Sequence, residues 1–286
     1  MSSVLPDDLK LGPVKLKVSD LTRSLAFYTE IVGLRLLHET QGEAQLTADG
    51  LTPLVVLREV ADAQVTARRS AAGLYHFAIL LPTREALGLT LRHLIGTGIH
   101  IGHSDHLVSE ALYITDPDHN GIEIYSDRPR DTWRRDTQGH YIMASDPIDR
   151  DGLVALAEGK EWNGLPPGTV IGHIHFHVQS LDSSRRFYCN VLGFDIVADA
   201  SSRGALFISA GGYHHHIGLN IWAGEHAPIP PAQATGLDYA TVVFPDEASL
   251  RQTLDRLGSA GIAVAEQNGF RSVTDPSGIT LRLVTV

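Results

Sequence analysis

The chain contains two segments that each occur twice, and this internal repetition restricts its fold more than any other feature. Residues 11–34 recur as residues 171–194 at a constant offset of 160 positions, with matching Phe-Tyr pairs and a shared glycine. A second segment, which begins at Gly73, recurs from Gly236 at an offset of 163 positions. A chain of 286 residues with this pattern is expected to consist of repeated modules.

Four modules follow from these offsets. They occupy about residues 11–60, 73–127, 171–224 and 236–286. Each module opens with alternating apolar and polar residues, which predicts a strand. A helix with a polar residue suited to cap its N-terminus follows and ends at a glycine, as at Gly33 and Gly193. Two or three further strands complete a βαβββ unit.

The modules are grouped into two halves. Residues 1–127 hold modules 1 and 2, and residues 169–286 hold modules 3 and 4. Residues 128–168 lie between them, carry Pro, Gly and mixed charge, and are predicted to form a linker that packs across the surface. The predicted fold class is therefore α+β, with two tandem domains.

The composition excludes several classes of partner. The formal net charge is −10, which argues against nucleic acid or an anionic membrane as the main partner. No apolar run approaches the ~18 residues of a membrane-spanning helix, and the N-terminus lacks the features of a secretory signal. The single cysteine, Cys189, fits a reducing compartment, so a cytoplasmic protein is expected. Apolar sheet surfaces make a homo-oligomer reasonable.

Sequence patterns within the modules link them to a known superfamily. The pattern S/D-L-x-x-S-x-x-F-Y occupies residues 20–28 and 180–188, and D-P-x-x-N-G-x-E occupies residues 116–123. Together with the opening strands, these patterns resemble the vicinal oxygen chelate superfamily of glyoxalases, bleomycin-resistance proteins and extradiol dioxygenases. The resemblance covers nearly the whole chain outside residues 128–168. It implies paired βαβββ modules whose open mixed sheets form cups around one metal ion.

The resemblance also implies which modules hold the metal. Superfamily members take a His from the first strand of each of two paired modules and a Glu from a last strand. Module 2 supplies His76 and Glu123, and module 3 supplies His173, with His175 on the same strand as an alternative ligand. Modules 1 and 4 lack such residues, since their corresponding positions hold Pro13, Tyr239 and either Thr280 or Arg282.

The predicted ligand set has a recognisable chemistry. Two imidazoles and one carboxylate on one face of a metal are typical of non-haem Fe(II) oxygenases, so Fe(II) is the expected cofactor, with Mn(II) as an alternative. A structural zinc site is usually closed and often rich in cysteine, whereas this chain has one cysteine.

Two further segments resemble the surroundings of the metal in extradiol dioxygenases. The run YHHHIGL at residues 213–219 resembles the segment with the acid–base histidine, and this implies His215 in that role. The segment GHSDHLVS at residues 102–109 resembles the segment with a second active-site histidine. It implies His103, with His106 as an alternative.

A tyrosine completes this resemblance. Tyr113 stands ten residues before Glu123, as the active-site tyrosine of the family does relative to its Glu. In the family these groups lie on the third and fourth modules. Here module 2 is therefore expected to take the place of the usual fourth module and to pair with module 3.

The function implied by the resemblance is extradiol ring cleavage. A catechol and O₂ would be converted to 2-hydroxymuconate semialdehyde, so a small aromatic diol and O₂ are the expected partners. Two alternatives remain. One is a glyoxalase-like metal isomerase, which would need a second carboxylate ligand, and the other is a non-catalytic binding protein of the resistance type.

Overall fold

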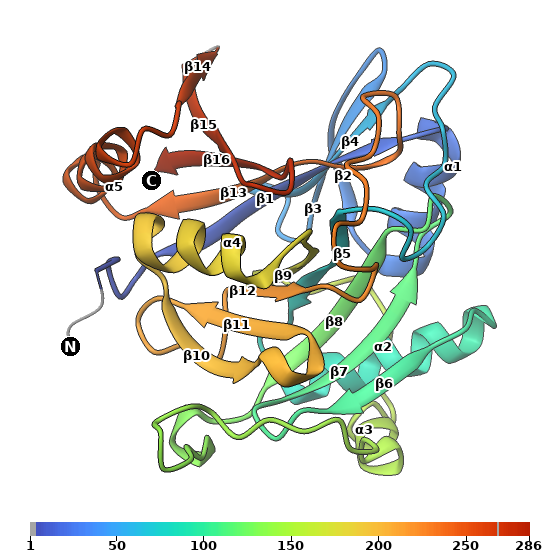
Figure 1. The fold of residues 1–286 in the computed structure, drawn as a ribbon. Helices are drawn as coiled ribbons and strands as arrows, with labels where there is room; N and C mark the ends of the chain where they lie inside the picture. The colour runs from blue at the N-terminus through green and yellow to red at the C-terminus, as the bar shows by residue number, and fades with distance from the viewer. Residues whose placement is uncertain (1–3, 268) are drawn as a thin grey trace.

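The computed structural model describes residues 4–267 and 269–286 and contains two eight-stranded mixed sheets (Figure 1). The first sheet has the strand order β14-β15-β16-β13-β1-β4-β3-β2, and the second has the order β10-β11-β12-β9-β5-β8-β7-β6. We call them the β1/β13 cup and the β5/β9 cup, after their two central strands. This arrangement confirms the predicted α+β class.

The bounds of the strands follow the module boundaries. The β1/β13 cup contains β1 (Lys10–Val18), β2 (Arg35–Thr40), β3 (Glu43–Thr47), β4 (Pro53–Glu59), β13 (Gly236–Phe244), β14 (Ala265–Gln267), β15 (Phe270–Thr274) and β16 (Thr280–Thr285). The β5/β9 cup contains β5 (Gly73–Leu80), β6 (Gly102–Asp105), β7 (Ser109–Thr115), β8 (Gly121–Asp127), β9 (Val170–His177), β10 (Asp195–Ala200), β11 (Ala205–Ser209) and β12 (Ile217–Asn220).

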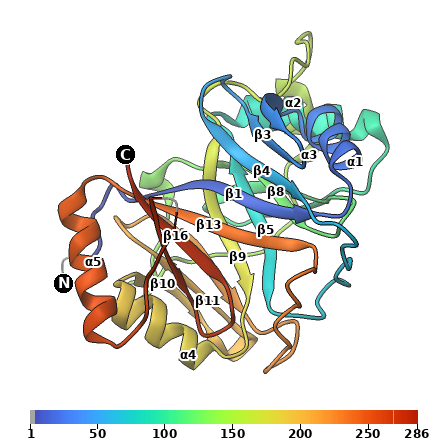
Figure 2. The same cartoon turned by 90° about the horizontal axis from the view of Figure 1, so that it is seen from above.

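Each cup combines one module from each half of the chain. Strand β5 of module 2 pairs antiparallel with β9 of module 3, and β1 of module 1 pairs antiparallel with β13 of module 4. Figure 2 shows these central strands crossing the molecule next to one another. The expected pairing of modules 2 and 3 is therefore confirmed.

The helices cover the outer faces of the sheets. They comprise α1 (Leu21–Ala26), α2 (Arg84–Thr97), α3 (Arg150–Leu156), α4 (Leu181–Arg185) and α5 (Glu247–Ser259), with short 3₁₀ turns η2 (Arg130–Thr132) and η4 (Ser201–Arg203). Side chains cap α1, α2, α4 and α5 at their N-termini, as the sequence predicts.

The repeated first helices end in an unpredicted way. Both α1 and α4 continue as π-helical segments, η1 (Phe27–Val32) and η3 (Arg186–Leu192). Each π-helix ends at a glycine in the left-handed region, Gly33 with φ 89° and Gly193 with φ 100°. The glycine stop was predicted from the sequence, but the wider helical turn was not.

One apolar core connects the two cups. It contains side chains from the central strands of both sheets, such as Leu16, Phe77 and Phe176, and from the helices that cover them. Among the residues that the structure describes, no helix is both long and apolar enough to cross a membrane.

Residues 128–168 connect the halves and pack on the β5/β9 cup. Backbone hydrogen bonds between Asp105 and Asp146, and from Tyr141 to the carbonyl of Val197, fix this segment against both modules of the cup. Its residues Tyr141, Ile142 and Met143 line the cavity of that cup.

Candidate metal centre and its surroundings

Three neighbouring strands bring the predicted ligands together in the β5/β9 cup. In register, Ala78 of β5 pairs with Glu123 of β8 on one side and with His173 of β9 on the other. His76 lies two residues before Ala78 and therefore on the same face of the sheet. The small side chain of Ala78 leaves room for Glu123 and His173 to approach one another above it.

The distances describe one compact cluster. The Nε2 atom of His76 lies 3.0 Å and that of His173 3.1 Å from Oε2 of Glu123. One ligand atom of each residue lies within 4.8 Å of the others. His173, rather than the alternative His175, belongs to this cluster, and both histidines line the adjoining cavity.

The electrostatics of the cluster favour a bound cation. Glu123 is 2% exposed and no Lys or Arg of the described chain forms an ion pair with it. Burial alone would raise the pKa of Glu123, but His173 and His76 lower it well below its ordinary value. Burial lowers the pKa of His173 to about 4, so this imidazole is neutral at pH 7. Neutral imidazoles and an ionised carboxylate are the forms that bind divalent metals.

The hydrogen bonding leaves metal-binding atoms free. His76 Nε2 is buried and has no hydrogen-bond partner among the described residues, although it lies near Glu123. Buried polar atoms are rarely left without a partner unless an ion or water completes the site. Two imidazole nitrogens and one carboxylate oxygen that converge in this way fit a divalent cation of the Fe(II) or Mn(II) type.

His215 lies beside the ligand cluster. Its side chain is 8% exposed, and its ring centroid is 4.1 Å from that of His173. Burial lowers the pKa of His215 well below its ordinary value, so the side chain is a neutral base. His215 also lines the cavity, as expected for a group that meets a ligand.

A second histidine and an aspartate form a chain of polar contacts that ends at His215. The Nδ1 atoms of His214 and His215 are 2.8 Å apart, and Nε2 of His214 is 2.9 Å from Oδ1 of Asp127. Neither Asp127 nor this position of His214 was predicted from the sequence. The signal was weak, because Asp127 lies 87 residues earlier in the chain than His214.

Tyr113 and His106 form the opposite side of the site. The His106 Nδ1 atom is 2.7 Å from the carbonyl oxygen of Ala144, so Nδ1 carries the proton. The Nε2 atom therefore accepts the hydrogen bond that the Tyr113 hydroxyl donates over 2.6 Å. Burial and the charge of Glu123 raise the pKa of Tyr113 well above its ordinary value.

The structure does not place His103 at the site. His103 pairs with Leu112, whose side chain is in the core, whereas Tyr113 pairs with Gly102 and Glu123. Because side chains alternate along a strand, His103 lies on the face of the sheet opposite to Tyr113, and it is exposed. The assignment of His103 is therefore corrected in favour of His106, which lines the cavity.

The cluster opens into a cavity of about 680 Å³. Its walls come from both modules and from the connecting segment. Apolar and aromatic residues form much of the lining, namely Val108, Tyr141, Ile142, Met143, Ala198, Ala200, Ala205, Phe207 and Trp222, and Asp136, His140, Asp199 and Arg203 also line it. Such a wall suits an aromatic ring.

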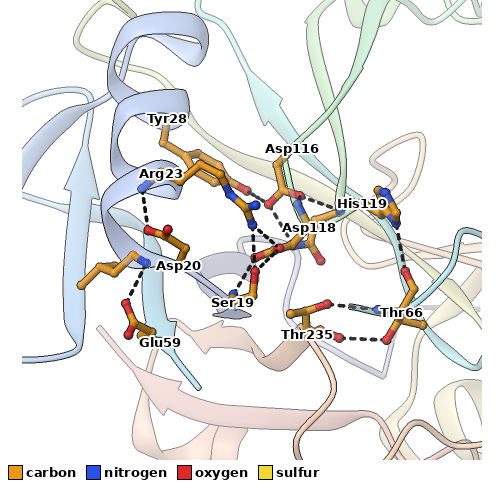
Figure 3. A network of polar contacts seen from close by, with 12 residues as sticks. Ser19, Asp20, Arg23, Tyr28, Glu59, Thr66, Asp116, Asp118, His119 and Thr235 are labelled. Atoms are coloured by element: carbon orange, nitrogen blue, oxygen red, sulfur yellow. Dashed lines mark hydrogen bonds and ion pairs between the residues drawn. The ribbon is translucent and has the colours of Figure 1, made fainter. Parts of the chain in front are cut away.

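A polar network fixes the turn that leads into β8 and thus the position of Glu123 (Figure 3). Asp116 accepts hydrogen bonds from the backbone of Asp118 and Asn120 and from the Tyr28 hydroxyl, which lies on the repeated helix of module 1. Asp118 in turn is held by Ser19 and by Arg23 at 2.6 Å. The turn is thus anchored to the other cup.

The fold and this site define a class of protein: paired βαβββ modules with a three-residue His-His-Glu site inside one cup. The comparison with sequence families agrees, since residues 10–124 and 170–283 match the Glyoxalase/Bleomycin resistance protein/Dioxygenase superfamily. The chain belongs to this superfamily.

Individual relatives support the same assignment. The chain is 52% identical over 271 residues to a catechol-2,3-dioxygenase of Bacillus subtilis (strain 168), covering 94% of this chain and 95% of the relative. Two crystal structures share the fold at low identity. A proposed dioxygenase from Bacillus subtilis subsp. subtilis str. 168 has a TM-score of 0.66 at 13% identity, over 99% of this chain and 86% of the other. Glyoxalase I from Zea mays has a TM-score of 0.55 at 15% identity, over 96% and 92%.

Proposed function

We propose that this protein is a catechol 2,3-dioxygenase, an extradiol enzyme that converts a catechol and O₂ to 2-hydroxymuconate semialdehyde. The observation that carries the proposal is the convergence of His76, His173 and Glu123 within 4.8 Å at the base of an aromatic-walled cavity. The name of the relative with 52% identity supports the same reaction.

His76, His173 and Glu123 would hold the metal, with Fe(II) as the proposed ion and Mn(II) as the alternative. Such an ion, when bound, offers open positions for a diol and O₂ and a path for electrons between them. A single carboxylate ligand leaves a positive charge at the centre, which favours an anionic catecholate over a neutral ring.

The Tyr113–His106 pair is proposed to bind and orient the diol. The Tyr113 hydroxyl donates a hydrogen bond to His106, so its oxygen can accept a hydrogen bond from a substrate hydroxyl. His106 is fixed in turn by the carbonyl of Ala144 in the connecting segment.

His215 is proposed to accept a proton from the substrate and to return it later. Its Nδ1 atom faces His214, which leaves Nε2 as the nitrogen available to a ligand. His214 and Asp127 orient the ring of His215 through their chain of hydrogen bonds. Acid–base help of this kind is typically worth about 10²–10⁴ in rate.

The glyoxalase-like alternative is disfavoured by one glycine. Strand β12 is the last strand of module 3, and Gly218 pairs there with His175 as Glu123 pairs with Ala78 in module 2. Gly218 therefore occupies the place where a second carboxylate ligand would be needed. A Cβ atom at Gly218 would lie 2.7 Å from the ring of His175, so no acidic side chain fits without rearrangement.

Oxygen uptake tests the proposal directly. Protein loaded anaerobically with Fe(II) is mixed with catechol and O₂, and the product is identified by mass. We expect one O₂ per catechol and the semialdehyde as product. Tight metal binding without uptake of O₂ with catechol, substituted catechols or hydroquinones would refute the dioxygenase proposal. Absence of both metal and catechol binding would favour a resistance-type binding protein.

The proposed cellular setting follows from the cysteine content. The only cysteine, Cys189, lies half-buried in η3, and burial raises the pKa of its thiol to about 11. A protonated, packed thiol needs no oxidising compartment, so we place the protein in the cytoplasm, with a small aromatic diol and O₂ as its partners.

A further inference from the structure

A second cavity of about 400 Å³ lies beside the metal cavity and is separate from it. Tyr75 lines both cavities and forms a wall between them. The second cavity has a different character, because Lys17, Arg58, Arg68 and Arg69 all line it. These are four of the 23 Lys and Arg residues of a chain whose net charge is −10.

The four cations come from separate parts of the chain. Lys17 lies on β1, Arg58 lies on β4, and Arg68 and Arg69 lie in the loop between β4 and β5. Their convergence is therefore a property of the tertiary fold and not of a basic run in the sequence.

The acidic residues of this cavity do not neutralise all four cations. Asp118 already forms an ion pair with Arg23 at 2.6 Å. Figure 3 draws this contact. Asp238 forms an ion pair with Arg58 at 3.2 Å. Within the described chain no carboxylate lies within ion-pair distance of Lys17, Arg68 or Arg69.

Lys17 is partly buried, whereas Arg68 and Arg69 are exposed. Its Nζ atom donates only one hydrogen bond within the described chain, to the carbonyl of Ala232 at 3.3 Å. Burial lowers the pKa of Lys17, although the nearby charge of Asp238 opposes that shift. An ammonium group with spare donors that lines a cavity can donate hydrogen bonds to a bound anion.

The loop with the two arginines is held in place. Thr66 forms two hydrogen bonds with Thr235, and its carbonyl oxygen is 3.1 Å from Nδ1 of His119 (Figure 3). Arg69 and His119 both adopt left-handed backbone conformations, with φ 56° and 70°, which non-glycine residues seldom do. Such conformations persist where the surrounding structure enforces them, and they are concentrated at binding sites.

We propose that this cavity is a second binding site, for a small organic anion that carries carboxylate or phosphate groups. Lys17 supplies a partly buried charge, and Arg69 supplies an exposed planar guanidinium, a combination suited to both oxyanions. Leu237 and Ile229 add apolar surface to the same cavity for the carbon part of the ligand. The site is independent of the reaction at the metal centre.

Calorimetric titration of the full chain tests this site, with inorganic phosphate and malonate as separate probes at constant ionic strength. We expect saturable binding of at least one probe with a Kd of about 1 mM or tighter. The probe that binds more tightly identifies the ligand as a phosphate or a carboxylate. Sodium chloride alone is the control, because non-specific screening would affect both probes equally.

Two variants locate the bound anion. Lys17→Met and Arg69→Gln are each expected to weaken binding about tenfold, the effect of losing one charge-assisted hydrogen bond. Arg69 is exposed, so its variant is expected to fold even if Lys17→Met does not. The matched control is Lys10→Met, an exposed lysine on the same strand, which should leave the affinity unchanged.

Three outcomes would overturn the proposal. The first is no saturable binding of either probe above the chloride control. The second is an affinity for the anion that is unchanged in Arg69→Gln and, if that variant folds, also in Lys17→Met. The third is loss of binding in His76→Ala, which would place the anion at the metal cluster instead of in the basic cavity.

Discussion

The two cups share their backbone geometry but differ in the chemistry of their inner faces. In the β5/β9 cup, His76 pairs with His175 across the central strands. In the β1/β13 cup, the equivalent pair is Tyr239 with Lys15. The register is the same, so the residues at corresponding positions can be compared directly.

The ligand positions differ completely between the cups. Arg282 pairs with Thr241 as Glu123 pairs with Ala78, so an arginine stands where the metal carboxylate would be. The structure thereby resolves the choice between Thr280 and Arg282 in favour of Arg282. Its Nη1 atom donates to the Tyr239 hydroxyl at 2.7 Å.

This difference shows that the fold fixes where side chains lie, whereas the identity of a few side chains determines whether a cup can bind a metal. A divalent cation in the β1/β13 cup would meet the charge of Arg282, and Pro13 offers no side-chain ligand there. The same backbone in the β5/β9 cup presents two imidazoles and a carboxylate. We therefore expect only one cup to bind a metal.

The largest effect is expected from replacing, in each cup, the residue at the position of the metal-binding carboxylate. Glu123→Ala removes the only charged ligand and should abolish both tight metal binding and ring cleavage. Arg282→Ala, its counterpart, should leave both unchanged. Metal content after gel filtration measures the difference, and a Glu123→Ala protein that retains a full equivalent of metal would show that the ligand set is wrong.

The next largest effect concerns the acid–base residue. His215→Phe preserves an aromatic ring beside His173 but removes the proton acceptor, so metal content should persist while turnover falls about 10²–10⁴-fold. Steady-state oxygen uptake measures the change. Normal turnover in this variant would remove His215 from the mechanism.

The two equivalent turns provide a matched pair for stability. Asp116 accepts a hydrogen bond from Tyr28 before β8, and Asp275 accepts one from Tyr188 before β16, each at 3.1 Å. Replacing either aspartate by Ala leaves buried donors without acceptors and should lower the free energy of unfolding by about 3 kcal/mol.

Only one of the two turn variants should change the affinity for the metal. Asp116→Ala loosens the entrance to the strand that carries Glu123, so metal affinity should fall as well. Asp275→Ala should leave metal affinity unchanged. Urea unfolding and metal titration measure the two effects separately, and equal metal affinities in the two variants would contradict this role of the turn.

A smaller effect distinguishes the two candidate histidines, His103 on β6 and His106 directly after it. His106→Phe removes the acceptor of the Tyr113 hydroxyl and should lower turnover about tenfold, as expected for one lost hydrogen bond. His103→Phe changes an exposed side chain on the other face and should have no effect. The reverse result would restore His103 to the site.

The last predicted effect is on the pH dependence of the free energy of unfolding. Burial lowers the pKa of His216 from 6.5 to about 3 in the folded protein. The unfolded chain therefore binds a proton that the folded protein does not, and stability is lost as the pH falls from 6.5 toward 3, by at most about 1.4 kcal/mol per pH unit.

The variant His216→Asn isolates this contribution. Asparagine retains an acceptor near the position of Nδ1, which contacts the Ser209 hydroxyl at 2.9 Å, but it does not titrate. Thermal unfolding between pH 4 and 7 should show a shallower slope for the variant than for the original protein. Identical slopes would mean that His216 does not contribute.

Much of the fold was predictable because two segments of the sequence each occur twice. The repeat offsets predicted four βαβββ modules, and the absence of ligands in modules 1 and 4 predicted that module 2 pairs with module 3. The π-helical turns before Gly33 and Gly193 were not predicted, because the sequence pattern fixes where a helix ends but not the width of its last turn.

The site was predictable only where a residue and its sequence position were both distinctive. His76, His173 and Glu123 stand at the module positions where the superfamily carries its ligands, so the resemblance, applied to each module in turn, identified them. His103 and His106 lie in one short segment, and the choice between them depends on which face of β6 points into the cup. Asp127 escaped notice because its partner, His214, is brought near only by the pairing of distant modules.

The most direct test of the difference between the cups is the location and number of bound irons. Crystals of protein loaded anaerobically with Fe(II) can be measured at the iron absorption edge. We predict one anomalous peak per chain, between His76, His173 and Glu123, and none in the β1/β13 cup near Tyr239 and Arg282. A second peak in that cup, or a single peak elsewhere, would contradict this prediction.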